Sequence, residues 1–134
     1  MNPTPVEVAR RFVDAINAHD LAALAECMTD DHRFTDSLGA VVVGRALVCD
    51  AWEQYFAMMP DYRVEIHEAY GDGPVVVLTG RAEGTYSPNG QIQPEGHWSI
   101  PAAWRARIAE GQVSEWQVYA DNEPVRERIR SRSA

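Results

Sequence analysis

Two aspartates stand near the ends of predicted strands, and their carboxylates are the side chains of this sequence best suited to move protons. Asp36 lies at the end of the strand pattern at 33–36, before a turn that contains Gly39, and Asp121 follows the last strand pattern. A carboxylate inside an apolar pocket has a raised pKa and can exchange a proton with a carbon acid near neutral pH. Both residues also suit a structural role, because Asp36 can cap its turn and Asp121 can cap a C-terminal helix.

Apolar residues at helical spacing predict three helices in the first 60 residues. The first helix starts at Thr4, a cap residue that has an acid, Glu7, three residues on, and it buries Phe12 and Ile16. The second starts at Asp20, which can cap it, and is stopped by residues 29–31. The third, at 47–59, is strongly amphipathic and ends at a proline. These helices supply apolar faces that need a sheet to pack on.

Strand patterns follow the helices. They lie at 33–36, 41–43, 62–66, 75–83, 97–108 and 113–119. The period of the apolar residues is two after residue 60, which is typical of strands. Helices followed by a long antiparallel meander predict an α+β fold with the helices packed on one face of the sheet.

Because of Pro101, the sequence does not decide which face of the strand at 97–108 points inward: proline indicates a strand edge or a bulge, and a bulge changes the alternation. The two alternatives for the inward face are His97, Ser99 and Arg105, or Trp98, Ile100 and Trp104.

Composition excludes several classes of function. A chain of 134 residues with 46% hydrophobic content supports one domain over residues 1–134. The net charge of −8 argues against a nucleic-acid partner, whose phosphates need clustered Lys and Arg. No phosphate loop, nucleotide fingerprint or nucleophile motif is visible, so we expect no cofactor.

The two cysteines point to a reducing compartment. Cys27 and Cys49 are far apart and have no Cys or His spacing that could bind zinc, so we expect free thiols and no metal site. Neither a signal-peptide pattern nor an apolar stretch of membrane-spanning length is present. A cytoplasmic protein with no membrane partner is expected.

Four stretches of the sequence carry a family resemblance. They are residues 12–21, 28–36, 44–45 and 110–113, the last with Trp116 and Asp121 nearby. Together they resemble the SnoaL-like branch of the NTF2-like (cystatin-like) superfamily over nearly the whole chain. The resemblance implies a conical fold in which three N-terminal helices and a curved, mostly antiparallel sheet enclose a pocket, frequently in a homodimer.

The resemblance also implies roles for the two aspartates. Asp36 matches the proton-abstracting aspartate of ketosteroid isomerases, and Asp121 matches the acid/base aspartate of SnoaL-like cyclases. The oxyanion hole of ketosteroid isomerases needs a tyrosine where this chain has Phe12, and an acid in the stretch 101–104, which has none. His97 or Tyr86 would have to donate the hydrogen bond instead; a lone histidine is otherwise a packed or surface residue.

Arg81 and Glu83 share one face of a strand and resemble the Arg-x-Asp pair of limonene-epoxide-hydrolase-like proteins. Those enzymes have a third acid on the final strand, and the matching position in this chain is Val118. An exposed cross-strand ion pair is the better interpretation of the two charges.

The expected ligand is a flat, largely apolar ring system, such as a polyketide-like or steroid-like molecule. The expected catalytic residues are Asp36, Asp121 and His97. The expected substrate-binding residues are Phe12, Ile16, Phe34, Trp52, Tyr55, Phe56, Met59, Arg81, Glu83, Tyr86, Trp104 and Trp116. One hypothesis is cofactor-free acid/base catalysis of an aldol-type cyclisation, isomerisation or dehydration. The other is a non-catalytic domain that binds a hydrophobic small molecule or a protein.

Overall fold

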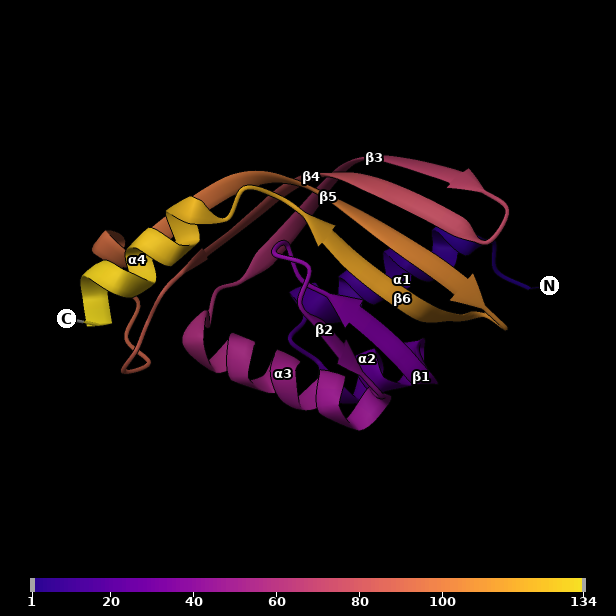
Figure 1. Cartoon of the computed structure of the whole chain (residues 1–134), viewed down its shortest axis with the longest axis horizontal. Coiled ribbons are helices and arrows are strands. Elements are labelled where there is room, and N and C mark those ends of the chain that lie inside the picture. The colour runs from indigo at the N-terminus through magenta and orange to yellow at the C-terminus, as the bar shows by residue number, and fades with distance from the viewer. Residues whose placement is uncertain (1, 134) are drawn as a thin grey trace.

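A strongly bent sheet arches over the first helix in the computed structural model, which describes residues 2–133 (Figure 1). The helices are α1 (Pro5–Asn17), α2 (Leu21–Cys27), α3 (Arg45–Met58) and α4 (Glu123–Ser133), with a short 3-10 turn η1 (Pro94–Gly96). The strands are β1 (Met28–Thr35), β2 (Val41–Val43), β3 (Arg63–Asp72), β4 (Val75–Thr85), β5 (His97–Ala109) and β6 (Gln112–Tyr119). This arrangement confirms the predicted NTF2-like α+β fold and adds a fourth helix at the C-terminal end.

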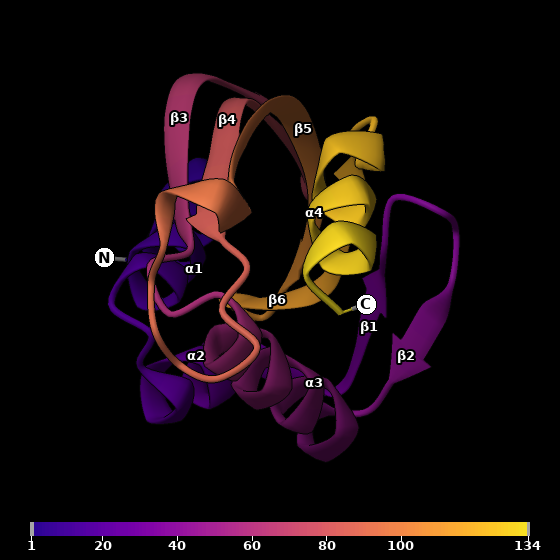
Figure 2. The same ribbon diagram turned by 90° about the vertical axis from the view of Figure 1, so that its left-hand side faces the viewer.

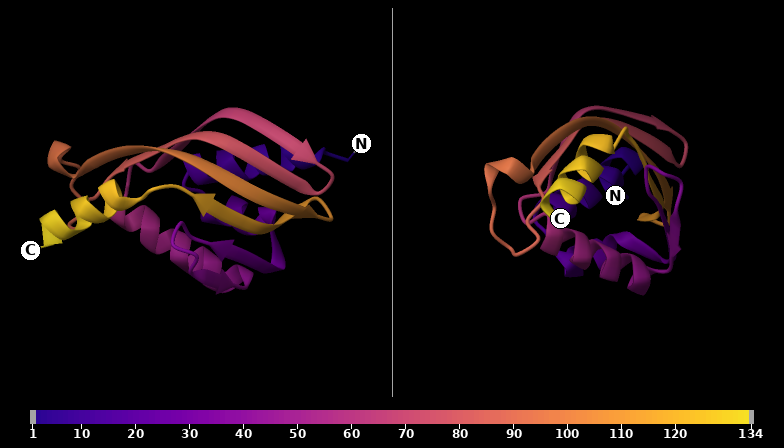
Figure 3. Two further views of the ribbon diagram at one scale, coloured as in Figure 1. Left: turned by 45° about the horizontal axis from the view of Figure 1, so that its top comes forward. Right: turned by 60° about the vertical axis from the view of Figure 1, so that its left-hand side comes forward.

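The six strands form one sheet in the order β2-β1-β6-β5-β4-β3. All neighbouring pairs are antiparallel except β1 and β6, which are parallel. The long strands β4 and β5 bend over the helices, and α3 and α4 lie around the open end of the arch (Figures 2 and 3). One end of the cone is therefore filled by α1 and the other is bordered by α3 and α4.

The first helix begins and packs as its sequence predicts. Thr4 and Glu7 form a capping box, in which each side chain accepts a hydrogen bond from the other residue's backbone N–H. Phe12 and Ile16 are fully buried, and the Phe12 ring lies 4.7 Å from that of Trp116 on β6. These contacts form the closed, apolar end of the cone.

The first strand starts earlier than predicted. Residues 29–31 were expected only to stop the second helix, but β1 begins at Met28, which pairs with Val113 of β6. A register shift between Met28 and Arg33 accommodates the polar segment. The prediction was wrong because the partner strand β6 is distant in sequence, and pairing with it overrides the local turn propensity.

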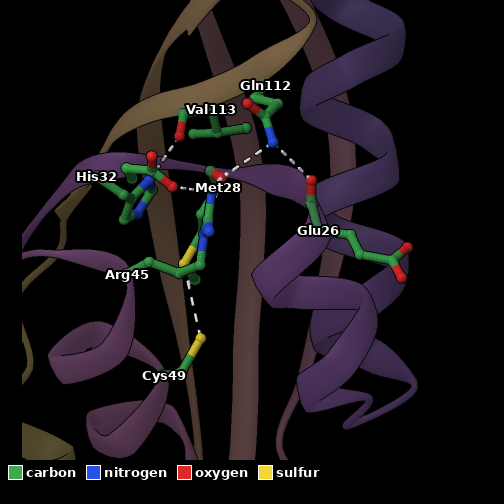
Figure 4. Close-up of polar contacts among 8 residues, drawn as sticks. Glu26, Met28, His32, Arg45, Cys49, Gln112 and Val113 are labelled. Atoms are coloured by element: carbon green, nitrogen blue, oxygen red, sulfur yellow. Dashed lines mark hydrogen bonds and ion pairs between the residues drawn. The ribbon is translucent and has the colours of Figure 1, made fainter.

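A group of polar side chains fixes β1 against β6 and α3 (Figure 4). The Arg45 guanidinium donates to the carbonyl oxygen of Met28 and pairs with Asp30. The Gln112 amide donates to the carbonyls of Glu26 and Met28, and His32 Nδ1 lies 2.7 Å from the carbonyl of Val113. We call Arg45, Gln112 and His32, with the backbone that they contact, the β1–β6 junction.

None of the helices between residues 2 and 133 is both long and apolar enough to cross a membrane.

Candidate functional site

A cavity of about 310 Å³ lies between α3, the inner face of the sheet and α4. Its size is near the lower end of the range for small-molecule sites. Its walls are mostly aromatic and aliphatic. The lining residues are Phe34, Asp36, Ser37, Val48, Ala51, Trp52, Tyr55, Tyr62, Ala82, Trp98, Ile100, Ala102, Trp104, Val118, Ala120, Asn122, Val125, Arg126 and Ile129.

Alternation along β5 settles which of its faces lines the cavity. Trp98, Ile100 and Trp104 line the cavity and are buried. Successive side chains of a strand point to opposite faces, so His97 and Ser99 lie on the outer face. At Pro101 the strand pairs with β4 alone, because its pairing with β6 begins only at Ala103. The proline thus sits at a local edge, as the sequence indicated.

Asp36 lies in the cavity wall and also holds its own turn. Its Oδ1 accepts hydrogen bonds from the backbone N–H groups of Leu38 and Ala40, both at 2.9 Å. Its Oδ2 has no hydrogen bond to any residue in the described range. The structural role of Asp36 is therefore confirmed, and its other carboxylate oxygen is available for the predicted chemistry.

Asp121 does not line the cavity, contrary to the prediction. Its neighbour Ala120 lines the wall, and Asp121 is exposed, with Oδ1 accepting the backbone N–H of Glu123 at the start of α4. This bond holds the carboxylate at the helix start, which is the structural role that the sequence also allowed.

His97, Arg81 and Glu83 are not in the cavity either. Ala82 lines the wall, so Arg81 and Glu83 point to the outer face, where Arg81 Nε donates to Ser99 Oγ at 3.1 Å. His97 is exposed and its Nδ1 lies 3.4 Å from Thr85 Oγ1. The cross-strand partners of the two charges are oppositely charged, Glu65 facing Arg81 and Arg63 facing Glu83.

This arrangement also removes the epoxide-hydrolase trio. The Arg-x-Glu pair faces outward, and Val118, the position expected to lack the third acid, lines the cavity with an apolar side chain. No carboxylate therefore enters the cavity from these three positions.

Several aromatic and apolar residues predicted to bind substrate belong to the core instead. They are buried but do not line the cavity: Phe12, Ile16, Phe56, Met59, Tyr86 and Trp116. Phe56 stacks on His19 with ring centroids 4.1 Å apart, and Met59 Sδ accepts the indole N–H of Trp98. The predicted wall residues that do line the cavity are Phe34, Trp52, Tyr55 and Trp104.

Tyr62 is a lining residue that the sequence analysis missed as part of the site. It packs edge-on against Tyr55 with ring centroids 4.9 Å apart, and the centroid of the Trp98 ring lies 6.1 Å from that of Tyr62. Burial raises the pKa of the Tyr55 phenol, and burial together with the nearby Tyr55 raises the pKa of Tyr62. Both phenols are therefore neutral hydrogen-bond donors at physiological pH. Tyr62 begins the alternating pattern of β3, which was the available signal.

The C-terminal helix contributes a further wall. Val125, Arg126 and Ile129 line the cavity from α4, at the spacing of one helix face. The Arg126 guanidinium pairs with Glu123 at 2.9 Å on the same helix. The sequence analysis allowed a C-terminal helix capped by Asp121 but did not place it at the cavity; the apolar Val125 and Ile129 were the available signal.

No cluster of three or more metal-ligating side chains was found among residues 2–133.

Comparison with known proteins assigns the family. The SnoaL-like domain model matches residues 9–116, and the chain belongs to this family. No curated protein matches the sequence significantly.

Solved structures share the fold at low sequence identity. A candidate SnoaL-like polyketide cyclase from Shewanella denitrificans is 17% identical with a TM-score of 0.82, over 97% of this chain and 99% of that one. An epoxide hydrolase of the LEH-like type from M. tuberculosis is 13% identical with a TM-score of 0.77, over 95% and 90%. A candidate ketosteroid isomerase from Kribbella flavida is 16% identical with a TM-score of 0.69, over 87% and 77%. Proteins described with different reactions thus share this architecture, so the site must decide the chemistry.

Proposed function

We propose that this SnoaL-like protein is a cofactor-free enzyme that removes and returns protons on a flat, largely apolar substrate, with Asp36 as the base. One observation carries the proposal: the Asp36 carboxylate stands in the wall of a cavity that is otherwise lined mostly by aromatic and aliphatic side chains. The Oδ1 bonds to the turn fix its position, and Oδ2 is left to accept a proton.

The reaction class follows from proton transfer at carbon. Aldol-type ring closure, isomerisation of an unsaturated ketone and dehydration can each begin with removal of a proton next to a carbonyl group. The names of structural neighbours, which include a candidate cyclase and a candidate ketosteroid isomerase, favour this group of reactions. Water activation on an epoxide is disfavoured, because the Arg81 and Glu83 side chains face away from the cavity.

A proton-exchange assay tests the proposal without the natural substrate. 2-Tetralone is a flat two-ring ketone with acidic α-protons, and its deuterium uptake in D₂O is followed by NMR. We expect the protein to accelerate uptake and Asp36→Asn to lose about 100-fold or more of that acceleration, as is typical when a general base is removed. The asparagine side-chain oxygen can still accept the turn hydrogen bonds, so the loop is preserved.

Asp121→Asn is the matched control, because this carboxylate lies outside the cavity. Its exchange rate should equal that of the wild type. Exchange lost equally in both variants, or unchanged in Asp36→Asn, would contradict the assignment of Asp36.

The second candidate is a non-catalytic binding domain. It is favoured because Asp121 lies outside the cavity. Asp36 is then the one carboxylate among the described lining residues, and one of its oxygens is already bonded to its turn. Saturable binding of 2-tetralone without exchange above the buffer rate would support this candidate over the enzyme.

We also propose a cytoplasmic homodimer. The unpaired thiols of Cys27 and Cys49 suit a reducing compartment. The outer face of the sheet exposes Tyr70, Val77 and Tyr119, an apolar surface that a second copy would cover. Sedimentation equilibrium should give twice the monomer mass, and Val77→Lys combined with Tyr119→Lys should give the monomer. A monomeric wild type would refute the dimer.

A further inference from the structure

We propose that Tyr55 and Tyr62 form a pair of hydrogen-bond donors that binds one carbonyl or enolate oxygen of the ligand. This deepens the function proposed above by naming the chemical group that the cavity recognises. Neither residue was expected to serve as a donor from the sequence, where His97 and Tyr86 were the candidates.

The first step of the argument is the position of the two phenols. Tyr55 comes from the last turns of α3 and Tyr62 from the segment just before β3, and both line the cavity. Their rings are perpendicular, with centroids 4.9 Å apart. A carbonyl oxygen has two lone pairs, so one ligand oxygen bound beside these adjoining rings could accept a hydrogen bond from each hydroxyl.

The second step is that the hydroxyls have no partner. Within residues 2–133, neither the Tyr55 nor the Tyr62 hydroxyl makes a hydrogen bond, although Tyr62 is only 8% exposed. Neither hydroxyl oxygen is completely enclosed by the chain, although both rings are largely buried, so each hydroxyl can donate to a ligand in the cavity. The same wall contains Trp52, whose indole N–H is buried without a partner. The adjacent Trp98, in contrast, donates its indole N–H to Met59 Sδ.

The third step is that hydrogen bonds fix the backbone that carries Tyr62. The Tyr62 backbone N–H donates to the carbonyl of Met59, and its carbonyl lies 2.8 Å from His19 Nε2. The preceding Asp61 accepts hydrogen bonds from the backbone N–H and the hydroxyl of Thr85. Donors fixed before the ligand arrives need little reorganisation, which is the condition for stabilising an oxyanion.

The phenols differ in charge from another unpaired donor of the same wall. Arg126 pairs with Glu123 through Nη2, and its Nε is buried without a partner, but its guanidinium is positively charged. The phenols are neutral donors, because burial raises their pKa. A neutral donor suits a carbonyl that becomes an enolate when Asp36 removes the neighbouring proton.

A pair of probes that differ by one oxygen tests the donor pair. Fluorenone and fluorene are flat tricyclic molecules, one a ketone and the other its hydrocarbon, and fluorenone has no α-proton, so binding is measured without turnover. Dissociation constants come from quenching of tryptophan fluorescence. The quantity of interest is the preference, the ratio of the fluorene constant to the fluorenone constant.

We expect the preference to fall about 5- to 100-fold in the Tyr55→Phe/Tyr62→Phe double variant, since two hydrogen bonds are removed, while fluorene affinity stays the same. Each single variant should show an intermediate loss. Tyr119→Phe, which removes an exposed phenol from the outer face, is the matched control and should leave the preference unchanged.

Infrared spectroscopy gives a readout that a purely structural role would not move. The carbonyl stretch of bound fluorenone should lie at lower frequency in the wild type than in the double variant. An unchanged preference and an unchanged stretch would overturn the donor pair.

The outcomes separate this inference from the function proposed above. Equal preference in wild type and double variant, with Asp36-dependent exchange of 2-tetralone intact, refutes the donors alone. Loss of the preference in the double variant without any exchange supports the donors and refutes the enzyme. Failure of both probes to bind the wild type overturns the donor pair as well as an apolar-ligand site.

Discussion

The cavity wall and the β1–β6 junction differ in whether their polar side chains have hydrogen-bond partners within the chain. In the junction, Arg45 and Gln112 share the carbonyl of Met28, and each has a second partner. In the wall, the hydroxyls of Tyr55 and Tyr62 have no hydrogen-bond partner between residues 2 and 133, although both side chains are at least partly buried. Arg45 and Gln112 thus find their partners within the chain, whereas the two phenols have unpaired hydroxyls, as the proposed donor pair requires.

His32 is the one junction residue that departs from this contrast. It is fully buried, and its Nδ1 must be the protonated nitrogen, because the carbonyl of Val113 can only accept. Its Nε2 is buried without a partner, and its ring lies 5.7 Å from that of Phe12. A neutral His32 is therefore required by the fold, which makes the junction sensitive to acid.

The largest effect is expected from truncating the junction histidine. His32→Ala removes a fully buried ring and leaves the Val113 carbonyl without its donor, so the free energy of unfolding should fall by about 2–4 kcal/mol. Urea unfolding followed by circular dichroism measures it. A loss below about 1 kcal/mol would mean that the junction does not depend on this side chain.

Removing the junction arginine should have a smaller effect. Arg45→Ala leaves Met28 with Gln112 as its remaining side-chain donor, and the Arg45 side chain is 37% exposed, so we expect a loss of about 1 kcal/mol. The same urea titration applies. An unchanged stability would show that Gln112 alone satisfies the carbonyl.

Acid should destabilise the protein through His32. Burial lowers its pKa in the folded state below the ordinary value of 6.5, although the Val113 carbonyl, Asp31 and Glu115 oppose this. The unfolded chain then binds more protons, so stability is full above about pH 6.5 and falls as the pH drops towards the lowered folded-state pKa. Urea midpoints between pH 7.5 and 5 should fall less in His32→Gln than in the wild type. Equal falls would exclude His32 as the sensitive group.

The smallest effect on stability is expected in the cavity wall. Tyr62→Phe removes a hydroxyl that has no partner in the chain, so the free energy of unfolding should change by less than about 1 kcal/mol, towards greater stability if it changes. Thermal unfolding measures this, with His32→Ala as the contrasting variant. A clear loss of stability would break the contrast between the two regions, because it would show that the hydroxyl supports the fold.

Local patterns predicted most of the elements correctly. The capping box of α1, the amphipathic α3 and the alternating strands of the second half are set by residues close in sequence, and the structure shows them near the expected positions. The early start of β1 was missed because the strand is fixed by β6, more than 80 residues away in the case of Met28 and Val113.

The site was only partly predictable. Phe34, Asp36, Tyr55 and Trp104 line the cavity as expected, whereas Asp121 and His97 do not. The residues around an aspartate at the end of a strand look alike whether the side chain points into the cavity or caps a helix, so the local sequence cannot distinguish the two.

The sequence alone determined the α+β architecture and the apolar character of the interior, because periodicity and caps act over a few residues. The family was indicated by the resemblance of four stretches of the sequence to SnoaL-like proteins. The tertiary structure alone decided which of the aspartates enters the cavity, which face of β5 is inward, and that Tyr55 and Tyr62 meet. These facts depend on strand register and on the packing of α3 and α4 across the arch, where segments far apart in sequence come together.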